Sequence, residues 1–342
     1  MYKSLALKLL VSALIVYSIG CGDKKDDKTK SGKQDSIIAS LITKDPATGK
    51  DKVQLKYVVT KGDKFSYKMV AKTSNSENSP ATEGKEIKQD NEINYFYTKE
   101  VDNVEPSGII TYKVTYDSIL ITSQMEDQIV KYNSNVNDSM KNNPAFIQYN
   151  AVMREPFFIR VSPAGEITDV YGLEKIHENL FKALGDTLKE EDKMTIKESF
   201  GKESVKEVLQ QEYQMFPAYP VDVDSSWIKS YNNQIMFFEV VNSAKYTLKS
   251  IEDKDGKKIA NIEANLVIEF LNKEVKERGV KFTIEKSETN GSGKIAFDMN
   301  RGCITSKETS TTLNLEMRMS AQGQSAKSEQ KVITNMSVTL LN

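Results

Sequence analysis

The sequence predicts an α+β fold that is mainly antiparallel β, with curved sheets or a half-barrel built from two related β-units and a helical insertion at about residues 140–216. Three observations support this fold class. Apolar and polar residues alternate over most of the chain, the spacing becomes helical near the middle, and the segments on the two sides of the helices echo each other. Alternation with a period of two is typical of antiparallel strands that bury one face.

The first residues, 1–20, have the pattern of a signal peptide. Lys3 and Lys8 lead into an uncharged, mostly apolar run over residues 9–19, which is shorter than the roughly 20 residues that span a bilayer. The motif Ser18-Ile19-Gly20-Cys21 resembles the bacterial lipobox, although Leu is commoner at the position of Ser18. The resemblance implies cleavage before Cys21 and attachment of acyl chains, such as palmitate, at that cysteine, which anchor a protein to a membrane. An ordinary signal peptide followed by an unmodified cysteine is the alternative.

Composition divides the mature chain into a tether and a folded body. Residues 22–36 are highly charged and contain no large apolar residue, so we expect residues 21–45 to form a disordered tether. A β-rich globular body follows at 46–342, with a β-unit at 46–171, a helical segment at 172–216 and a β-unit at 217–342. Together with the anchor, this organisation predicts a cell-envelope protein, with the outer membrane as the favoured membrane and the body in the periplasm or at the cell surface.

Strands are expected wherever apolar residues recur at every second position. Before the helices these residues are Leu55, Tyr57, Val59, Phe65, Tyr67, Met69, Ile93, Tyr95, Tyr97, Ile110, Tyr112, Val114 and Tyr116. After the helices they are Ile262, Ala264, Leu266, Ile268, Phe270, Ile295, Phe297, Met299, Leu313, Leu315, Met317, Met319, Met336, Val338 and Leu340. Residues 74–90 lack such a pattern, and we interpret them as a long hairpin loop.

Two stretches have helical spacing instead. Apolar residues recur every three or four positions in two runs, the first being Leu173, Ile176, Leu180, Leu184 and Leu188 and the second Val205, Val208, Leu209, Tyr213 and Phe216. Pro217 and Pro220 end the second run, and Pro144 suits the start of a shorter helix to Met153. The acidic residues 190–192 are interpreted as a solvated helix end.

The two β-rich segments share a weak internal echo, for which chance similarity is the alternative. An aromatic residue opens each segment after a turn, at residues 61–65 and 219–227, and a strand–glycine–strand hairpin comes late in each. In these two stretches the chain resembles a family of uncharacterised bacterial lipoproteins that combine a lipobox signal peptide with a duplicated β-rich domain of unknown function. The resemblance implies an envelope location and assigns no activity.

Few residues have the chemistry of a catalytic or metal site. His177 is the single histidine and lies beside an apolar helical stripe, so a residue without a catalytic role is expected. One histidine and Cys303 cannot form a usual zinc site, and Cys303 is expected to be a small buried residue. Asp222 and Asp224 read as a turn. No catalytic, cofactor-binding or metal site is therefore predicted, and the chain is expected not to be an enzyme.

Charge and aromatic content leave two functional hypotheses. The net charge of −1, from 47 basic and 48 acidic residues, gives no sign of nucleic-acid binding. Strand-face tyrosines, with Met69, Met317 and Met319, either line an apolar cavity or form the core, and core is favoured. The first hypothesis is a non-enzymatic envelope lipoprotein that binds a lipid or other apolar ligand. The alternative is a structural or protein-interaction lipoprotein without a small-molecule ligand. The expected partners are a membrane, through acyl chains on Cys21, and an apolar ligand; any protein partner is unknown.

Overall fold

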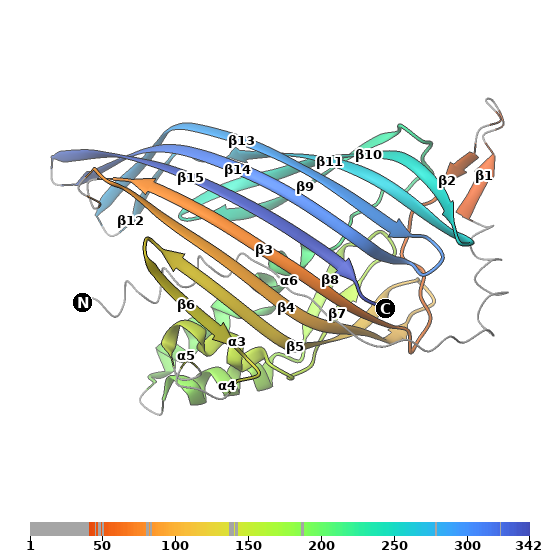
Figure 1. The fold of residues 1–342 in the computed structure, drawn as a ribbon, viewed down its shortest axis with the longest axis horizontal. Helices are drawn as coiled ribbons and strands as arrows, with labels where there is room; N and C mark the ends of the chain where they lie inside the picture. Colours follow the sequence, from red (N-terminus) through yellow and green to blue (C-terminus); the bar gives the residue numbers. More distant parts are fainter. Residues whose placement is uncertain are drawn as a thin grey trace.

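One curved antiparallel sheet of 13 strands dominates the computed structural model (Figure 1). The structure describes residues 41–342 apart from residues 45, 47–48, 50, 80–81, 83, 137–139, 141–142, 186–187, 278 and 322. The expected fold class, α+β with mainly antiparallel strands, is confirmed. Long strands and strong curvature follow from the extended alternation of apolar and polar residues, because only one face of each strand can pack against other apolar groups.

The strands before the helical segment are β1 (Ile42–Lys44), β2 (Asp51–Val53), β3 (Lys64–Asn78), β4 (Glu86–Val104), β5 (Ile110–Met125), β6 (Gln128–Asn133), β7 (Phe157–Val161) and β8 (Ile167–Tyr171). Those after it are β9 (Ser226–Ile235), β10 (Phe238–Lys254), β11 (Lys257–Phe270), β12 (Glu274–Glu277), β13 (Val280–Asp298), β14 (Cys303–Ala321) and β15 (Gln324–Leu340). The order in the large sheet is β8-β7-β5-β4-β3-β15-β14-β13-β11-β10-β9, with β6 on β5 and β12 on β13. β1 and β2 form a separate pair.

Apart from β2, the strands of the two expected β-units form a single sheet. They meet where the last strand, β15, pairs antiparallel with β3 over twelve residue pairs, from Glu329 opposite Asn78 to Leu340 opposite Tyr67. Each unit therefore stays contiguous in the sheet, and the C-terminal strand closes the seam between them.

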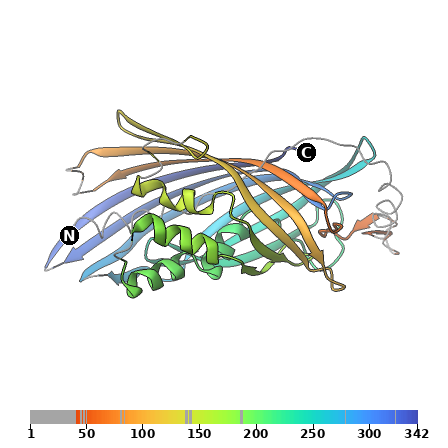
Figure 2. The same cartoon turned by 90° about the horizontal axis from the view of Figure 1, so that it is seen from below.

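Helices cover part of the concave face of this sheet (Figure 2). They are the 3-10 turn η3 (Pro144–Phe146) and the α-helices α3 (Ile147–Val152), α4 (Glu174–Leu184), α5 (Glu190–Ser199) and α6 (Lys202–Gln210). α4 ends at Gly185, whose φ of 99° favours glycine, so the predicted stripe does not continue as one helix to Leu188. The predicted solvated helix end at residues 190–192 is the exposed first turn of α5, and its acidic charges suit the positive end of the helix dipole.

Two expected boundaries differ in the structure. Residues 74–90, interpreted as a loop, are mostly strand, because β3 extends to Asn78 and β4 resumes at Glu86 in register with it. These strand ends carry polar residues on both faces, which removes the alternation that reveals a strand. Near the N-terminus, Leu41 is 2% exposed and β1 pairs with β2, so folded structure begins within the range that we expected to be tether.

Apolar side chains form two clusters on the inner, concave face. The helix-covered core joins the sheet to Ile176 and Leu180 of α4 and Leu209 of α6. The expected tyrosines belong to it, since Tyr57, Tyr67, Tyr95, Tyr97 and Tyr112 are all buried, which supports the core interpretation. The second group, here called the sheet cluster, consists of Phe238, Val240, Phe270, Ile284, Leu313, Leu315 and Met317.

Candidate functional site

The residues that stood out in the sequence are not brought together by the fold. Cys21, the predicted lipid attachment residue, lies outside the described residues. His177 of α4 contacts the backbone oxygen of Phe200 through its ring Nε2 at 2.9 Å, which ties α4 to the end of α5. The backbone oxygen of Asp222 accepts a hydrogen bond from the Ser225 amide in the predicted turn. Asp224 also pairs with Lys249 at 2.7 Å.

Cys303 is buried at the start of β14, in agreement with the sequence. Burial raises the pKa of its thiol to about 12, so the group stays protonated near neutral pH. A thiol in this state is a poor nucleophile and a poor metal ligand. Among the residues that the structure describes, no group of three His, Cys, Asp or Glu side chains could hold a metal ion.

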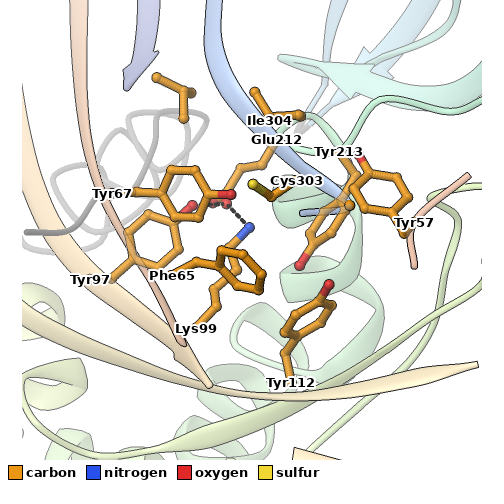
Figure 3. A pocket seen from close by; sticks show the side chains of 12 residues that line it. Tyr57, Phe65, Tyr67, Tyr97, Lys99, Tyr112, Glu212, Tyr213, Cys303 and Ile304 are labelled. Carbon is orange, nitrogen blue, oxygen red and sulfur yellow. Dashed lines mark hydrogen bonds and ion pairs between the residues drawn. The ribbon is translucent and has the colours of Figure 1, made fainter. Parts of the chain in front are cut away.

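A buried ion cluster lies inside the helix-covered core, close to Cys303 (Figure 3). We use this name for Lys99, Glu212, Tyr97 and Lys307. The Lys99 ammonium lies 3.3 Å from the Glu212 carboxylate, and both side chains are at most 10% exposed. The Tyr97 hydroxyl donates a hydrogen bond of 2.5 Å to the same carboxylate. Glu212 follows α6, so this contact fixes the end of the helical segment onto β4.

Three aromatic rings surround the Lys99 ammonium. Its nitrogen lies 4.1 Å from the ring centre of Tyr213, 5.1 Å from that of Tyr67 and 5.2 Å from that of Tyr97. The electron-rich faces of such rings attract a cation, and the attraction grows when water is excluded. Burial nevertheless lowers the pKa of Lys99, and the carboxylate of Glu212 works in the opposite direction. The rings and Glu212 together offset part of the lost hydration of this charge.

Lys307 of β14 adds a second buried amine to the cluster. Its nitrogen donates a hydrogen bond of 2.6 Å to the backbone oxygen of Gln211. Burial lowers its pKa to about 8; Glu212 raises this pKa and Lys99 lowers it. An unfolded lysine binds its proton more tightly, so protonated Lys307 opposes folding below pH 8 and this penalty fades as the pH rises.

The cavity within this cluster has a volume of about 20 Å³, with Tyr57, Phe65, Tyr112 and Tyr213 among its walls. That space suits one water-sized molecule and excludes an acyl chain. The Tyr213 hydroxyl is buried and has no hydrogen-bond partner among the described residues, so a small polar molecule would suit it. The arrangement is thus a polar joint between the helical segment and the sheet, and any lipid-sized ligand must lie elsewhere.

A second polar feature, here called the hydroxyl row, crosses the inner face beyond the helices. Strand pairing places its members directly opposite one another: Gly291, Thr311, Thr334, Thr73, Asn91 and Ser123. All except the glycine are half-buried. The Ser123 hydroxyl donates to the Asn91 side-chain oxygen at 2.6 Å. Hydroxyl and amide side chains thus follow one another across the inner face from β14 to β5.

The sheet cluster borders this row on the side away from the helices. Leu313 comes two residues after Thr311 on β14, and Val332 comes two residues before Thr334 on β15. In the described part of the chain, all members of the sheet cluster and all half-buried residues at its edge come from strands. Those edge residues are Ile235, Ile268, Val275, Phe282 and Val332. No helix of the described residues therefore contributes to this apolar cluster or to its edge.

Sequence reasoning missed the ion cluster and the hydroxyl row. Lys99 and Lys307 are charged residues, which pattern analysis assigns to the solvent side of a strand. A signal was present for Lys99, because it continues the inward series Tyr95, Tyr97 and precedes Val101 at the same spacing. Thr73, Thr311 and Thr334 became recognisable as a row only once the strand register placed them opposite one another.

Comparison with known proteins gives a family match and distant structural likenesses. The sequence model of DUF6263, described as a family of unknown function, matches residues 107–304. No curated protein matches the sequence.

Among solved structures, the chain is similar to lipovitellin, in a study of lipid–protein interactions, with a TM-score of 0.40 and 9% identity over 83% of this chain and 26% of that one. The chain thus spans about a quarter of that protein's length. DynF of the dynemicin biosynthesis pathway of Micromonospora chersina gives a TM-score of 0.18 and 6% identity over 95% and 96% of the two chains. OccK5 of Pseudomonas aeruginosa gives a TM-score of 0.23 and 6% identity over 83% of this chain and 100% of that one.

Proposed function

This chain belongs to DUF6263, a family of unknown function, so its role must come from its own residues, and we propose that it is a non-enzymatic, membrane-anchored lipoprotein of the cell envelope that binds a lipid or other apolar ligand on its open inner face. The anchor and the ligand are separate parts of this proposal. They rest on different residues and need different experiments.

The anchor rests on the N-terminal residues. A short apolar run, a lipobox-like motif and a charged tether lead from the signal peptide to the body. Among the helices in the described part of the chain, none has both the length and the apolar character needed to cross a bilayer. In the proposal, acyl chains on Cys21 hold the protein at the membrane, with the outer membrane favoured, and the body lies in the periplasm or at the cell surface.

Fractionation of cells that express the native chain or Cys21→Ser tests the anchor. The native protein should sediment with membranes and have a mass that exceeds the unmodified mature chain by its acyl groups. The serine variant should lose both properties. Equal membrane partitioning of the native protein and the serine variant, with an unmodified mass of the native protein, would refute lipid anchoring. This outcome would leave the ligand proposal unaffected.

The ligand rests on one observation, the absence of any helix residue from the sheet cluster and its edge within the described chain. An apolar sheet face is normally covered by a second layer. Phe238 and Phe270 pack edge to face, with ring centres 6.0 Å apart, and bury each other within the curled sheet. Ile268, Phe282 and Val332 at the edge remain half-buried, and an apolar chain laid along them would exclude water from their side chains.

The test uses the full mature chain with Cys21→Ser, so that no acyl group of its own competes. Native mass spectrometry of this protein should detect a non-covalent adduct that organic extraction removes, and a pyrene-labelled fatty alcohol should then bind saturably. Val332→Asp, which places a charge on the inner face, should abolish binding. Ile333→Asp changes the next residue of β15, on the convex face, and should leave it intact. If native mass spectrometry gave only the mass of the protein without an adduct, and the pyrene-labelled alcohol did not bind saturably, the ligand proposal would be refuted.

A further inference from the structure

The hydroxyl row extends across the inner face as a surface for hydrogen bonding. Residues directly opposite in an antiparallel sheet lie about 5 Å apart, so the six members span roughly 25 Å from β13 to β5. Thr311 and Leu313 are two residues apart on β14, which separates the polar row from the sheet cluster by roughly 7 Å. A single elongated molecule can therefore touch both.

No ionisable side chain belongs to the row. The nearest such groups on the inner face are Lys307 of β14, Glu77 of β3 and Lys229 at the β9 edge. Lys307 is buried and engaged with the Gln211 backbone oxygen. A charged head group on the row would thus lose water without gaining an opposite charge, whereas a hydroxyl or ester group would find donors and acceptors.

Two further polar groups on the inner face lack partners in the described part of the chain. The side-chain nitrogen of Asn242, a residue that is 4% exposed, and the hydroxyl of Thr289 are both buried without a hydrogen bond. Thr289 pairs with Leu313, so it lies where the polar row meets the sheet cluster, whereas Asn242 of β10 pairs with Ile268, two strands beyond the end of the row at Gly291. Buried polar groups are normally satisfied, and a polar atom of a bound molecule beside Thr289 would satisfy its hydroxyl.

We propose that the ligand is an uncharged amphiphile whose hydroxyl- or ester-bearing head group lies on the hydroxyl row while its acyl chain lies against the sheet cluster. This inference rests on the proposed function and specifies the ligand class of the same surface. Glycerolipid head groups without phosphate have this chemistry. The threonine hydroxyls recognise the head, and half-buried residues at the edge of the sheet cluster, such as Val332 and Ile268, hold the chain.

The test compares two probes with the same acyl chain on the Cys21→Ser protein at pH 8, monomyristoylglycerol and myristic acid. The acid is ionised at this pH, so the two probes share the acyl chain and differ in the head group, which is neutral in the glyceride and negative in the acid. We expect the glyceride to bind at least tenfold more tightly. The pair Thr311→Val and Thr334→Val should weaken glyceride binding about three- to tenfold per substitution and leave the acid unaffected. Thr312→Val, on the convex face of β14, is the matched control.

Three outcomes separate the inference from the proposed function. Tighter binding of the glyceride that depends on Thr311 and Thr334 supports both. Equal or tighter binding of myristic acid, or a glyceride affinity that the threonine substitutions do not change, overturns the head-group inference while the apolar surface stands. Binding of neither probe by a folded protein overturns both.

Discussion

Replacing Glu212 by glutamine should destabilise the folded body by about 3–5 kcal/mol, the usual cost of leaving a buried charge without its partner. Glutamine keeps the shape of the side chain and removes its charge. Glu212 is 4% exposed and is the carboxylate that Lys99 contacts at 3.3 Å, and it also raises the pKa of Lys307. Both amines would then stay buried without an opposite charge. At roughly 2–3 °C per kcal/mol for a body of this size, the melting temperature should fall by about 6–15 °C.

Urea denaturation followed by the fluorescence of Trp227 measures this loss, because Trp227 is the single tryptophan and is 4% exposed. Adding Lys99→Met to Glu212→Gln should recover part of the stability, since one uncompensated charge disappears. Glu308→Gln, an exposed position next to Lys307 on β14, should change stability by less than about 0.5 kcal/mol. A loss below about 1 kcal/mol for Glu212→Gln, or no recovery in the double variant, would refute this account of the cluster.

Three other predictions concern the same core. Between pH 8 and 9.5 the free energy of unfolding of the native chain should rise by roughly 1.5 kcal/mol relative to that of Lys307→Met, because the pKa of Lys307 is about 8 when folded and 10.5 when unfolded. If urea denaturation gave the two proteins parallel profiles of stability against pH, this prediction would be contradicted. Gly165→Ala should cost at least about 2 kcal/mol more than Gly323→Ala in the same assay. Both glycines have positive φ, but a Cβ at Gly165 would clash with the backbone oxygen of Gln214, whereas nothing lies within 4 Å of a Cβ at Gly323. Equal losses of stability would show that the clash relaxes freely. Cys303 in the folded Cys21→Ser protein should not react with Ellman's reagent at pH 8, and it should react fully in urea. Rapid reaction without denaturant would show that the thiol is accessible.

Alternation of apolar residues was enough to predict the fold class and most of the buried tyrosines. The prediction worked where one face of a strand meets the helix-covered core, as at Tyr95 and Tyr97. It failed where strands continue beyond the helices. At residues 74–78 of β3 both faces are polar, and hydrogen bonding to β15 and β4 holds the strand instead of burial.

The ion cluster could not be inferred because its members come from distant parts of the chain. Lys99 and Glu212 are separated by the whole helical segment, and a local pattern carries no information about which charges will meet. The same limit applies to the hydroxyl row, since each threonine is an ordinary strand residue until the register is known. The proposed anchor motif is the opposite case, because its resemblance to a lipobox depends only on adjacent residues such as Gly20 and Cys21.

The pairing of β15 with β3 sets a condition on when the protein can fold. Asn75 and Gln330, which share a hydrogen bond of 3.0 Å across this seam, are 255 positions apart. Contacts between such distant residues form slowly, since a long loop must close first. A chain that leaves the ribosome or a translocation pore N-terminus first therefore cannot complete this sheet until β15 has emerged. Without β15, β3 and β14 would have unpaired backbone edges, which are prone to aggregation.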